Sequence, residues 1–92
     1  MIQSFGDDET EALFRTGKSV RFGGIAKVAL RKLDYLNAAS TLDDLRVPPG
    51  NRLEALKGDR AGQYSIRIND QWRLCFRWMG RDAYAVEIVD YH

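Results

Sequence analysis

The end of the chain carries three chemically capable side chains in a row, Asp90, Tyr91 and His92. A carboxylate and an imidazole can exchange protons with a substrate near neutral pH, which indicates acid–base chemistry. The competing interpretation is an ordinary frayed chain end. His92 is the only histidine and Cys75 the only cysteine, too few for a structural zinc site or a disulfide. We therefore expect no metal and no cofactor.

Positive charge gathers in the second half of the chain, although the whole chain has a net charge of only +1. Between residues 52 and 81, seven basic residues stand against three acidic ones, and six of the seven are arginines. The planar fork of arginine suits phosphate, so this stretch is a candidate polyanion surface. The alternative is an ordinary solvated sheet face. The seven residues are Arg52, Lys57, Arg60, Arg67, Arg73, Arg77 and Arg81.

Arginines that neutralise a phosphate, beside groups that move protons, are the components of metal-free RNA cleavage. The ribose 2′-hydroxyl attacks the adjacent phosphorus while a base removes its proton and an acid protonates the leaving 5′-oxygen. Cations stabilise the charge that develops on the phosphorane oxygens. DNA lacks this internal nucleophile, and the glycines and Ser/Thr of a triphosphate-binding loop are missing around Gly58. The sequence favours RNA as the substrate.

The first half of the chain is predicted to be helical. Asp8–Glu11 has the spacing of a capping box, which should start a helix that Gly17 ends. Apolar residues at helical spacing then predict a longer helix from Ile25 to about Ala39. The two prolines in residues 47–51 exclude a helix there, and they divide the helical half from the remainder.

The second half alternates between apolar and polar residues, which predicts three strands joined by two tight turns at residues 69–71 and 80–82. The resulting antiparallel meander has one apolar face that only the two helices can cover. We therefore expect an α+β fold with two N-terminal helices on one face of a small antiparallel sheet, in a single domain spanning residues 1–92. The apolar face should carry Tyr64, Ile66, Ile68, Trp72, Leu74, Phe76, Trp78, Tyr84, Val86 and Ile88.

The opposite sheet face should be open and rich in arginine. If the last strand continues, Tyr91 shares the parity of Glu87 and reaches this face, with Asp90 and His92 on either side of it. An open face of this kind is a platform for a polyanion. Its arginines are Arg67, Arg73 and Arg77.

Composition places the chain among ordinary globular domains, with 45% hydrophobic and 29% charged residues. The start of the chain has no basic and apolar segments of a secretory signal. No apolar run approaches the roughly 18 residues that span a membrane. We therefore expect a soluble protein of the reducing cytoplasm with no membrane partner.

The chain resembles the HigB branch of the RelE/ParE toxins, also called plasmid maintenance killer proteins. The resemblance covers essentially the whole length, and it is most specific in NRLEALKGDRAGQYSIRINDQWRLCF (residues 51–76) and VEIVDYH (residues 86–92). It implies a toxin of a type II toxin-antitoxin system that cleaves mRNA in the ribosomal A site and inhibits translation. It also implies a HigA-like helix-turn-helix antitoxin, through which alone the system would bind operator DNA.

The resemblance also implies which residues take part in catalysis and RNA binding. Our hypothesis is that Lys57 and Arg73 hold the scissile phosphate, while Tyr91 stacks on a base or orients the sugar. Proton transfer is assigned to Asp90 and His92, with Glu54 as a further candidate. Some family members have a histidine where this chain has Glu54, an acid that can act as a base but cannot neutralise phosphate. The catalytic candidates are Lys57, Arg73, Asp90, Tyr91, His92 and Glu54, and the RNA-binding candidates are Arg60, Arg67 and Arg77.

Two other functions remain open. A ParE-like toxin that binds and inhibits DNA gyrase would share the fold, but a pure binder needs no proton-transfer cluster. A passive RNA-binding module would need exposed aromatic residues on the arginine face, whereas Trp72 and Trp78 have the apolar parity. For the antitoxin we expect contact with a helical surface, in particular the charged outer side of the second helix, or else with the acidic N-terminal run. The outer helix residues are Lys27, Arg31 and Asp34.

Overall fold

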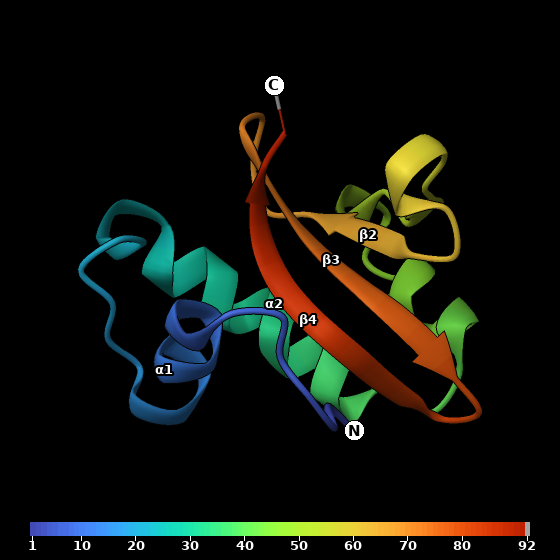
Figure 1. Cartoon of the computed structure of the whole chain (residues 1–92), viewed down its shortest axis with the longest axis horizontal. Helices are drawn as coiled ribbons and strands as arrows, with labels where there is room; N and C mark the ends of the chain where they lie inside the picture. Colours follow the sequence, from blue (N-terminus) through green and yellow to red (C-terminus); the bar gives the residue numbers. More distant parts are fainter. Residues whose placement is uncertain (92) are drawn as a thin grey trace.

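A computed structural model describes residues 1–91, which form two α-helices and a four-stranded antiparallel sheet in the order β1-β2-β3-β4. Figure 1 shows the long strands β3 and β4 crossing in front of α2, with α1 to one side. The predicted α+β fold, helical in its first half and antiparallel in its second, is confirmed. The elements are α1 (Asp8–Thr16), α2 (Ala26–Ala38), β1 (Glu54–Ala55), β2 (Tyr64–Arg67), β3 (Trp72–Met79) and β4 (Asp82–Asp90).

Helix α1 has its N-cap one residue earlier than predicted. The cap is Asp7, whose carboxylate accepts hydrogen bonds from the Thr10 backbone nitrogen at 2.6 Å and the Thr10 hydroxyl at 3.0 Å. The predicted capping box at Asp8 is wrong, because Glu11 pairs with Arg15 one turn later at 2.8 Å instead of reaching back. Gly17 ends the helix as predicted, in the left-handed conformation with φ of 77°.

The core lies between the sheet and α2. Leu33 and Leu36 of α2 and Leu74 and Phe76 of β3 are completely buried. The tryptophans of β3 pack against this cluster, as their parity predicted. The face and the period predicted for α2 and β3 are therefore confirmed. Neither helix in the described part of the chain is long and apolar enough to cross a bilayer.

Strand β4 breaks its alternation once. The pairing register with β3 shifts between Cys75 and Arg77, and Ala85 adopts a positive φ of 53°. A bulge of this kind inserts an extra residue, so the side chains that precede it in β4 point to the opposite face of the sheet from the one that strict alternation predicts. Tyr84 consequently pairs with Arg77 on the face away from the core, so the prediction that Tyr84 faces the core is wrong. Ala83 takes the buried position instead.

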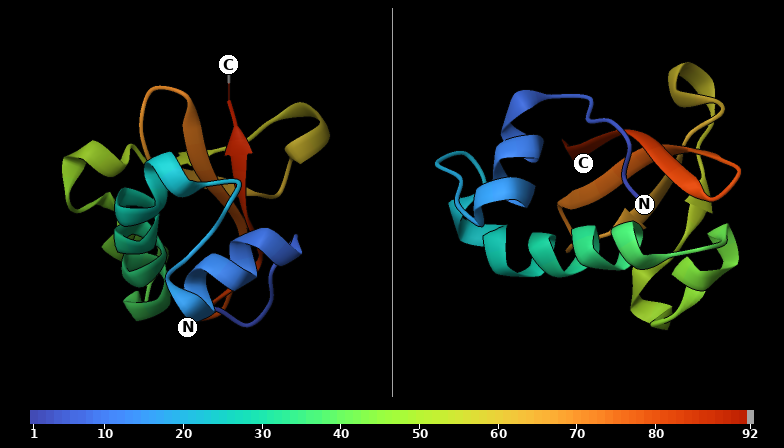
Figure 2. Two further views of the ribbon diagram at one scale, coloured as in Figure 1. Left: turned by 90° about the vertical axis from the view of Figure 1, so that its left-hand side faces the viewer. Right: turned by 90° about the horizontal axis from the view of Figure 1, so that it is seen from below.

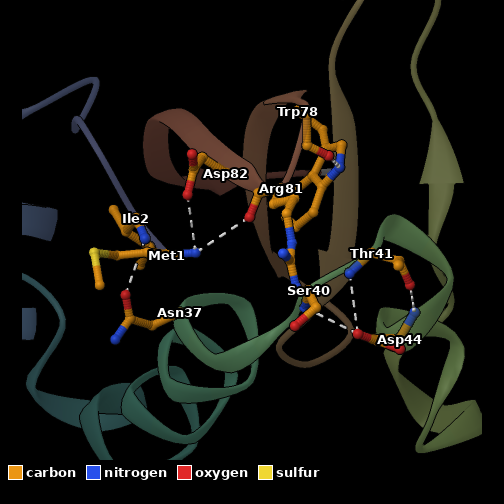
Figure 3. A network of polar contacts seen from close by, with 10 residues as sticks. Met1, Ile2, Asn37, Ser40, Thr41, Asp44, Trp78, Arg81 and Asp82 are labelled. Carbon is orange, nitrogen blue, oxygen red and sulfur yellow. Dashed lines mark hydrogen bonds and ion pairs between the residues drawn. The ribbon is translucent and has the colours of Figure 1, made fainter.

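The N-terminal segment lines the free edge of β4 rather than forming a long strand. Ile2 and Phe5 make single parallel bridges to Ala83 and Val86. Figure 3 shows how the start of the chain is fastened: the Met1 amine lies 3.4 Å from the Asp82 carboxylate. The segment thereby covers a strand edge that would otherwise be exposed.

A buried lysine joins α2 to the proline-containing loop. Lys32 Nζ donates to Asn51 Oδ1 at 2.6 Å, and Asn51 Nδ2 donates to the Leu45 carbonyl at 3.1 Å. Burial lowers the pKa of Lys32, and the charges of Arg31 and Arg67 lower it further. These contacts anchor the proline-containing loop to α2. No α-helix forms in residues 47–51, as predicted, and the loop contains one short 3-10 turn over Pro49–Asn51.

Candidate active site

The outer face of the sheet, meaning the face turned away from α2, is covered by residues 52–63. Strand β1 pairs with β2 at Glu54↔Ser65, and the 3-10 turn η4 (Gly58–Arg60) follows it. In both views of Figure 2, α2 and the η4 segment (yellow) lie on opposite sides of the sheet. The expected open face is therefore wrong. Ser65 and Cys75 are completely buried and Arg73 is 9% exposed. They are buried because the pairing of β1 with β2 places residues 52–63 over them. Strand β1 has only two residues, which is too short to show an alternating pattern in the sequence.

Arg73 lies on the outer face and is held by directed contacts. Its Nε donates to Ser65 Oγ at 2.7 Å, and its Nη2 donates to the Arg52 carbonyl at 2.7 Å and more weakly to the Ser65 carbonyl at 3.4 Å. Nη2 also lies 3.7 Å from Glu54 Oε1. A buried guanidinium is costly unless it is hydrogen-bonded and paired, so these contacts are what keep the charge in place.

The chain end places Tyr91 and Asp90 on different sides of β4. Asp90 pairs with Trp72 in the strand register, and its Oδ2 accepts a hydrogen bond from Gln71 Nε2 at 3.1 Å. Tyr91 returns to the outer face, where the Arg73 guanidinium carbon lies 5.4 Å from the centre of its ring. The prediction that Tyr91 reaches the arginine face is confirmed.

Two of the predicted RNA-binding arginines form ion pairs with acidic side chains of the same chain. Arg60 Nη2 lies 2.8 Å from Glu87 Oε1, across the outer face. Arg67 pairs with Asp70 across the turn of its own hairpin. Partly exposed pairs of this kind contribute little to stability, about 0–1 kcal/mol. RNA phosphate could therefore displace either acid at small cost.

Lys57 and Arg77 are exposed, and neither makes a hydrogen bond or ion pair with Arg73, Glu54 or Tyr91 in the described residues 1–91. Lys57 precedes η4, and no acidic oxygen of residues 1–91 lies within ion-pair distance of its amine. Arg77 passes close to Gly62, where a β-carbon would lie 3.1 Å from its Nη1. The structure thus brings Arg73, Glu54 and Tyr91 together, and His92 lies outside the described residues.

Cys75 lies on the outer face of the sheet but is not a candidate nucleophile. Cys75 is completely buried between β2 and β4, opposite Ser65 and Glu87 in the register. Burial raises the pKa of its thiol above the ordinary value. The protonated thiol is a poor nucleophile, so Cys75 is part of the packing.

Sequence reasoning missed Ser65 and the Arg52 carbonyl. The turn at residues 69–71 could have revealed Ser65, because it sets the register Arg67↔Arg73 and places Ser65 on the diagonal neighbour position of Arg73. Nothing in the sequence indicates the conformation of Arg52, a non-glycine residue with a positive φ of 47°.

Neither of two surface hollows includes Arg73. One, of about 270 Å³, lies beside the end of β4, and it is lined by charged groups of both signs. The other, of about 620 Å³, lies between α1 and the loop after it and contains none of the predicted site residues. The first hollow is lined by Asp7, Arg21, Arg60, Glu87, Ile88, Val89 and Asp90.

Comparison with known sequences gives one consistent family. Residues 3–92 match the family described as "RelE-like toxin of type II toxin-antitoxin system HigB". Toxin HigB-1 of Vibrio cholerae is 42% identical over 81 residues, which cover 86% of this chain and 85% of that protein. Endoribonuclease HigB of Proteus vulgaris is 35% identical over an alignment of 94 residues that covers 100% of both chains.

Solved structures show the same fold at low sequence identity. A YafQ mutant from Escherichia coli superposes with a TM-score of 0.60 at 15% identity, covering 98% of this chain and 91% of that one. A YoeB-YefM complex from Staphylococcus aureus gives a TM-score of 0.58 at 19% identity, covering 100% of this chain and 98% of that one. The shared architecture is two helices packed on a four-stranded antiparallel sheet.

Proposed function

The chain belongs to the HigB-like family of RelE-like toxins of type II toxin-antitoxin systems, and from this membership we propose an endoribonuclease that cleaves mRNA in the A site of translating ribosomes. The family match carries the toxin assignment. A relative aligned over its whole length and named an endoribonuclease supports the reaction. The observation in the structure that supports it best is Arg73, a fixed cation beside the Glu54 carboxylate and under Tyr91. Gyrase inhibition is not favoured.

Arg73 and Lys57 receive the scissile phosphate in this proposal. Arg73 is fixed on a sheet strand, so its charge is already in place when the phosphorane oxygens become more negative. Lys57 is exposed next to η4 and free of acidic partners in the described residues, so it can follow the RNA backbone. Both cations act on charge, and neither needs to transfer a proton.

Glu54 is assigned as the base that accepts the proton of the 2′-hydroxyl. Its side chain is half exposed and lies 3.7 Å from Arg73 Nη2. A base must lie within hydrogen-bond reach of the proton that it removes, and a phosphate bound to Arg73 brings the adjacent ribose to this carboxylate. Glu54 thereby takes the role that a histidine could hold at this position.

The chain end supplies the second proton transfer and the base contact. We assign protonation of the leaving 5′-oxygen to His92, and we keep Asp90 as a second candidate for proton transfer. Tyr91 has one ring face over Arg73 and 44% of its surface exposed. A nucleobase can stack on the exposed part of such a ring.

The ribosome orients the substrate in this proposal. Neither of the two hollows contains Arg73, so we expect a flexible RNA strand to be held poorly. Orientation of a substrate in attack geometry can contribute about 7–11 kcal/mol. We therefore expect free RNA to be cut poorly, and efficient digestion of a synthetic RNA without ribosomes would contradict this.

An antitoxin protein is the partner of this toxin, as for any type II system. We infer that it is a HigA-like helix-turn-helix protein and that operator DNA is bound only through it. Lys27, Arg31 and Asp34 are exposed on α2 and form the surface that we assign to the antitoxin. Unchanged affinity after substitution of these three residues would remove that assignment. Because mRNA is translated in the cytoplasm, we infer that the toxin acts there.

Mapping of new 5′ ends on cellular mRNA after brief expression tests the reaction. In-frame cuts within translated codons are the expected result, and an expressed Arg73→Ala variant is the control. Damaged DNA with intact mRNA would support the gyrase alternative and contradict the proposal.

A further inference from the structure

Arg73 has little freedom of orientation, because two of its three side-chain nitrogens are engaged inside the protein. Nε is bonded to the Ser65 hydroxyl, and Nη2 to the Arg52 carbonyl. No hydrogen bond joins Nη1 to any residue of the described chain 1–91. The guanidinium therefore has one nitrogen left for a substrate.

Hydrogen bonds, and not the acid, fix this orientation. The separation of 3.7 Å between Glu54 Oε1 and Nη2 is longer than a hydrogen bond. The Ser65 contact is 2.7 Å long and involves two buried groups. An ion pair without a hydrogen bond attracts the charge but does not set the plane of the guanidinium. Ser65 and Arg52 set it.

The Arg52 carbonyl is itself held by the fold. Its residue follows Asn51, which is completely buried and bonded to Lys32 of α2. The Arg52 nitrogen also donates to the Pro49 carbonyl at 3.2 Å. A chain of directed contacts therefore runs from α2 through the loop to Arg73.

We propose that Ser65 is a positioning residue for RNA cleavage. Its hydroxyl, together with the Arg52 carbonyl, fixes the guanidinium plane of Arg73 so that Nη1 is presented to a non-bridging oxygen of the scissile phosphate. Pre-set geometry of this kind increases the rate of the reacting complex more than its affinity. The inference rests on the proposed function, because it assumes that Arg73 contacts the phosphate.

Cleavage of a defined mRNA on programmed ribosomes, with kcat and KM measured separately, tests the role of Ser65. Ser65→Ala should lower kcat on the order of 10²-fold, the cost of a small misplacement, with KM nearly unchanged. Ser65→Thr keeps the acceptor oxygen and should restore most of the rate. Because Ser65 acts through Arg73, the double variant with Arg73→Ala should be no slower than Arg73→Ala alone.

Failure of the inference and failure of the proposed function give different results. Normal cleavage by Arg73→Ala would overturn the assignment of Arg73 and the inference with it. Slow cleavage by Arg73→Ala, together with normal cleavage by Ser65→Ala or with additive losses in the double variant, would overturn the inference alone.

A second measurement uses the unmodified protein, in case Ser65→Ala does not fold. Hydrogen exchange of the arginine Nε–H groups can be followed by NMR, with the exposed Arg77 as the internal control. The Arg73 Nε–H should exchange at least tenfold more slowly than that of Arg77, because it is buried and bonded. Equal exchange rates would show that Ser65 does not hold Arg73, and would overturn the inference.

Discussion

The two faces of the same sheet are built by different physical rules. On the inner face, Leu74 and Phe76 of β3 are buried by apolar contacts with α2. On the outer face, Arg73 and Ser65 are also buried, yet they are polar and held by directed hydrogen bonds. Apolar burial is non-directional and scales with area, whereas a buried polar group must have a partner in the right place. The inner face stabilises the fold, and the outer face fixes the position of one charge.

The largest expected effect is on the inner face. Phe76→Ala should lower the free energy of unfolding by about 3–5 kcal/mol, because it removes a fully buried ring and leaves a cavity. Urea unfolding followed by circular dichroism measures this. Met79→Ala, on an exposed residue of the same strand, is the matched control and should change stability by less than about 0.5 kcal/mol. A loss below 1 kcal/mol for Phe76→Ala would break the comparison.

Glu54→Gln should affect the reaction and not the fold. Loss of a general base typically lowers the rate by about 10²–10⁴-fold, while the half-exposed side chain contributes little to stability. Single-turnover cleavage on programmed ribosomes, measured across pH, provides the readout. Asp59→Asn, an exposed acid of the same segment, serves as control. A rate and pH profile equal to those of the parent would remove Glu54 from the mechanism.

Asp7→Ala should lower stability by about 1 kcal/mol, since it removes the cap of α1. Thermal and urea unfolding measure the change. Asp8→Ala distinguishes the observed cap from the predicted one, and it should have a smaller effect. The reverse order of the two variants would contradict the observed cap.

Cys75 should react slowly with a thiol reagent at pH 8, and fast only in denaturant. Burial raises the pKa of its thiol, so the folded state keeps a proton that the unfolded state loses. The preference of the folded state for the protonated thiol therefore contributes to stability below the unfolded pKa, and this contribution is lost as pH rises through the folded pKa. Cys75→Ala should accordingly lose less stability than the parent on passing to alkaline pH. Fast labelling of the native protein would show that the outer face is open.

The inner face could be predicted from sequence because burial imposes a period. Leu74 and Phe76 alternate with polar residues, and Leu33 and Leu36 follow the helical repeat, so each pattern indicates its own element. Tyr84 departs from the pattern because a bulge at Ala85 inserts one residue, and alternation cannot show where such an insertion falls.

The outer face could be predicted only in part. The outer-face position of Arg73 and the parity of Tyr91 were accessible, because both follow from strand phase. The cover over Arg73 was not, since Glu54 and Ala55 form an edge strand of two residues, too short for a period. The contact with the Arg52 carbonyl depends on a backbone conformation that arises only in the folded loop.

Cleavage of a defined mRNA on purified, programmed ribosomes by Arg73→Ala and Arg67→Ala tests the central claim most directly. Both variants remove one arginine from the outer face of the same hairpin, but only Arg73 is buried and fixed beside Glu54. Arg73→Ala should cleave about 10²–10³-fold more slowly than the parent while still folding and binding ribosomes. Arg67→Ala removes an RNA-binding candidate that is paired with Asp70 within its turn, so it should raise KM while kcat stays within about threefold of the parent. Equal rates for the parent and Arg73→Ala would contradict the account.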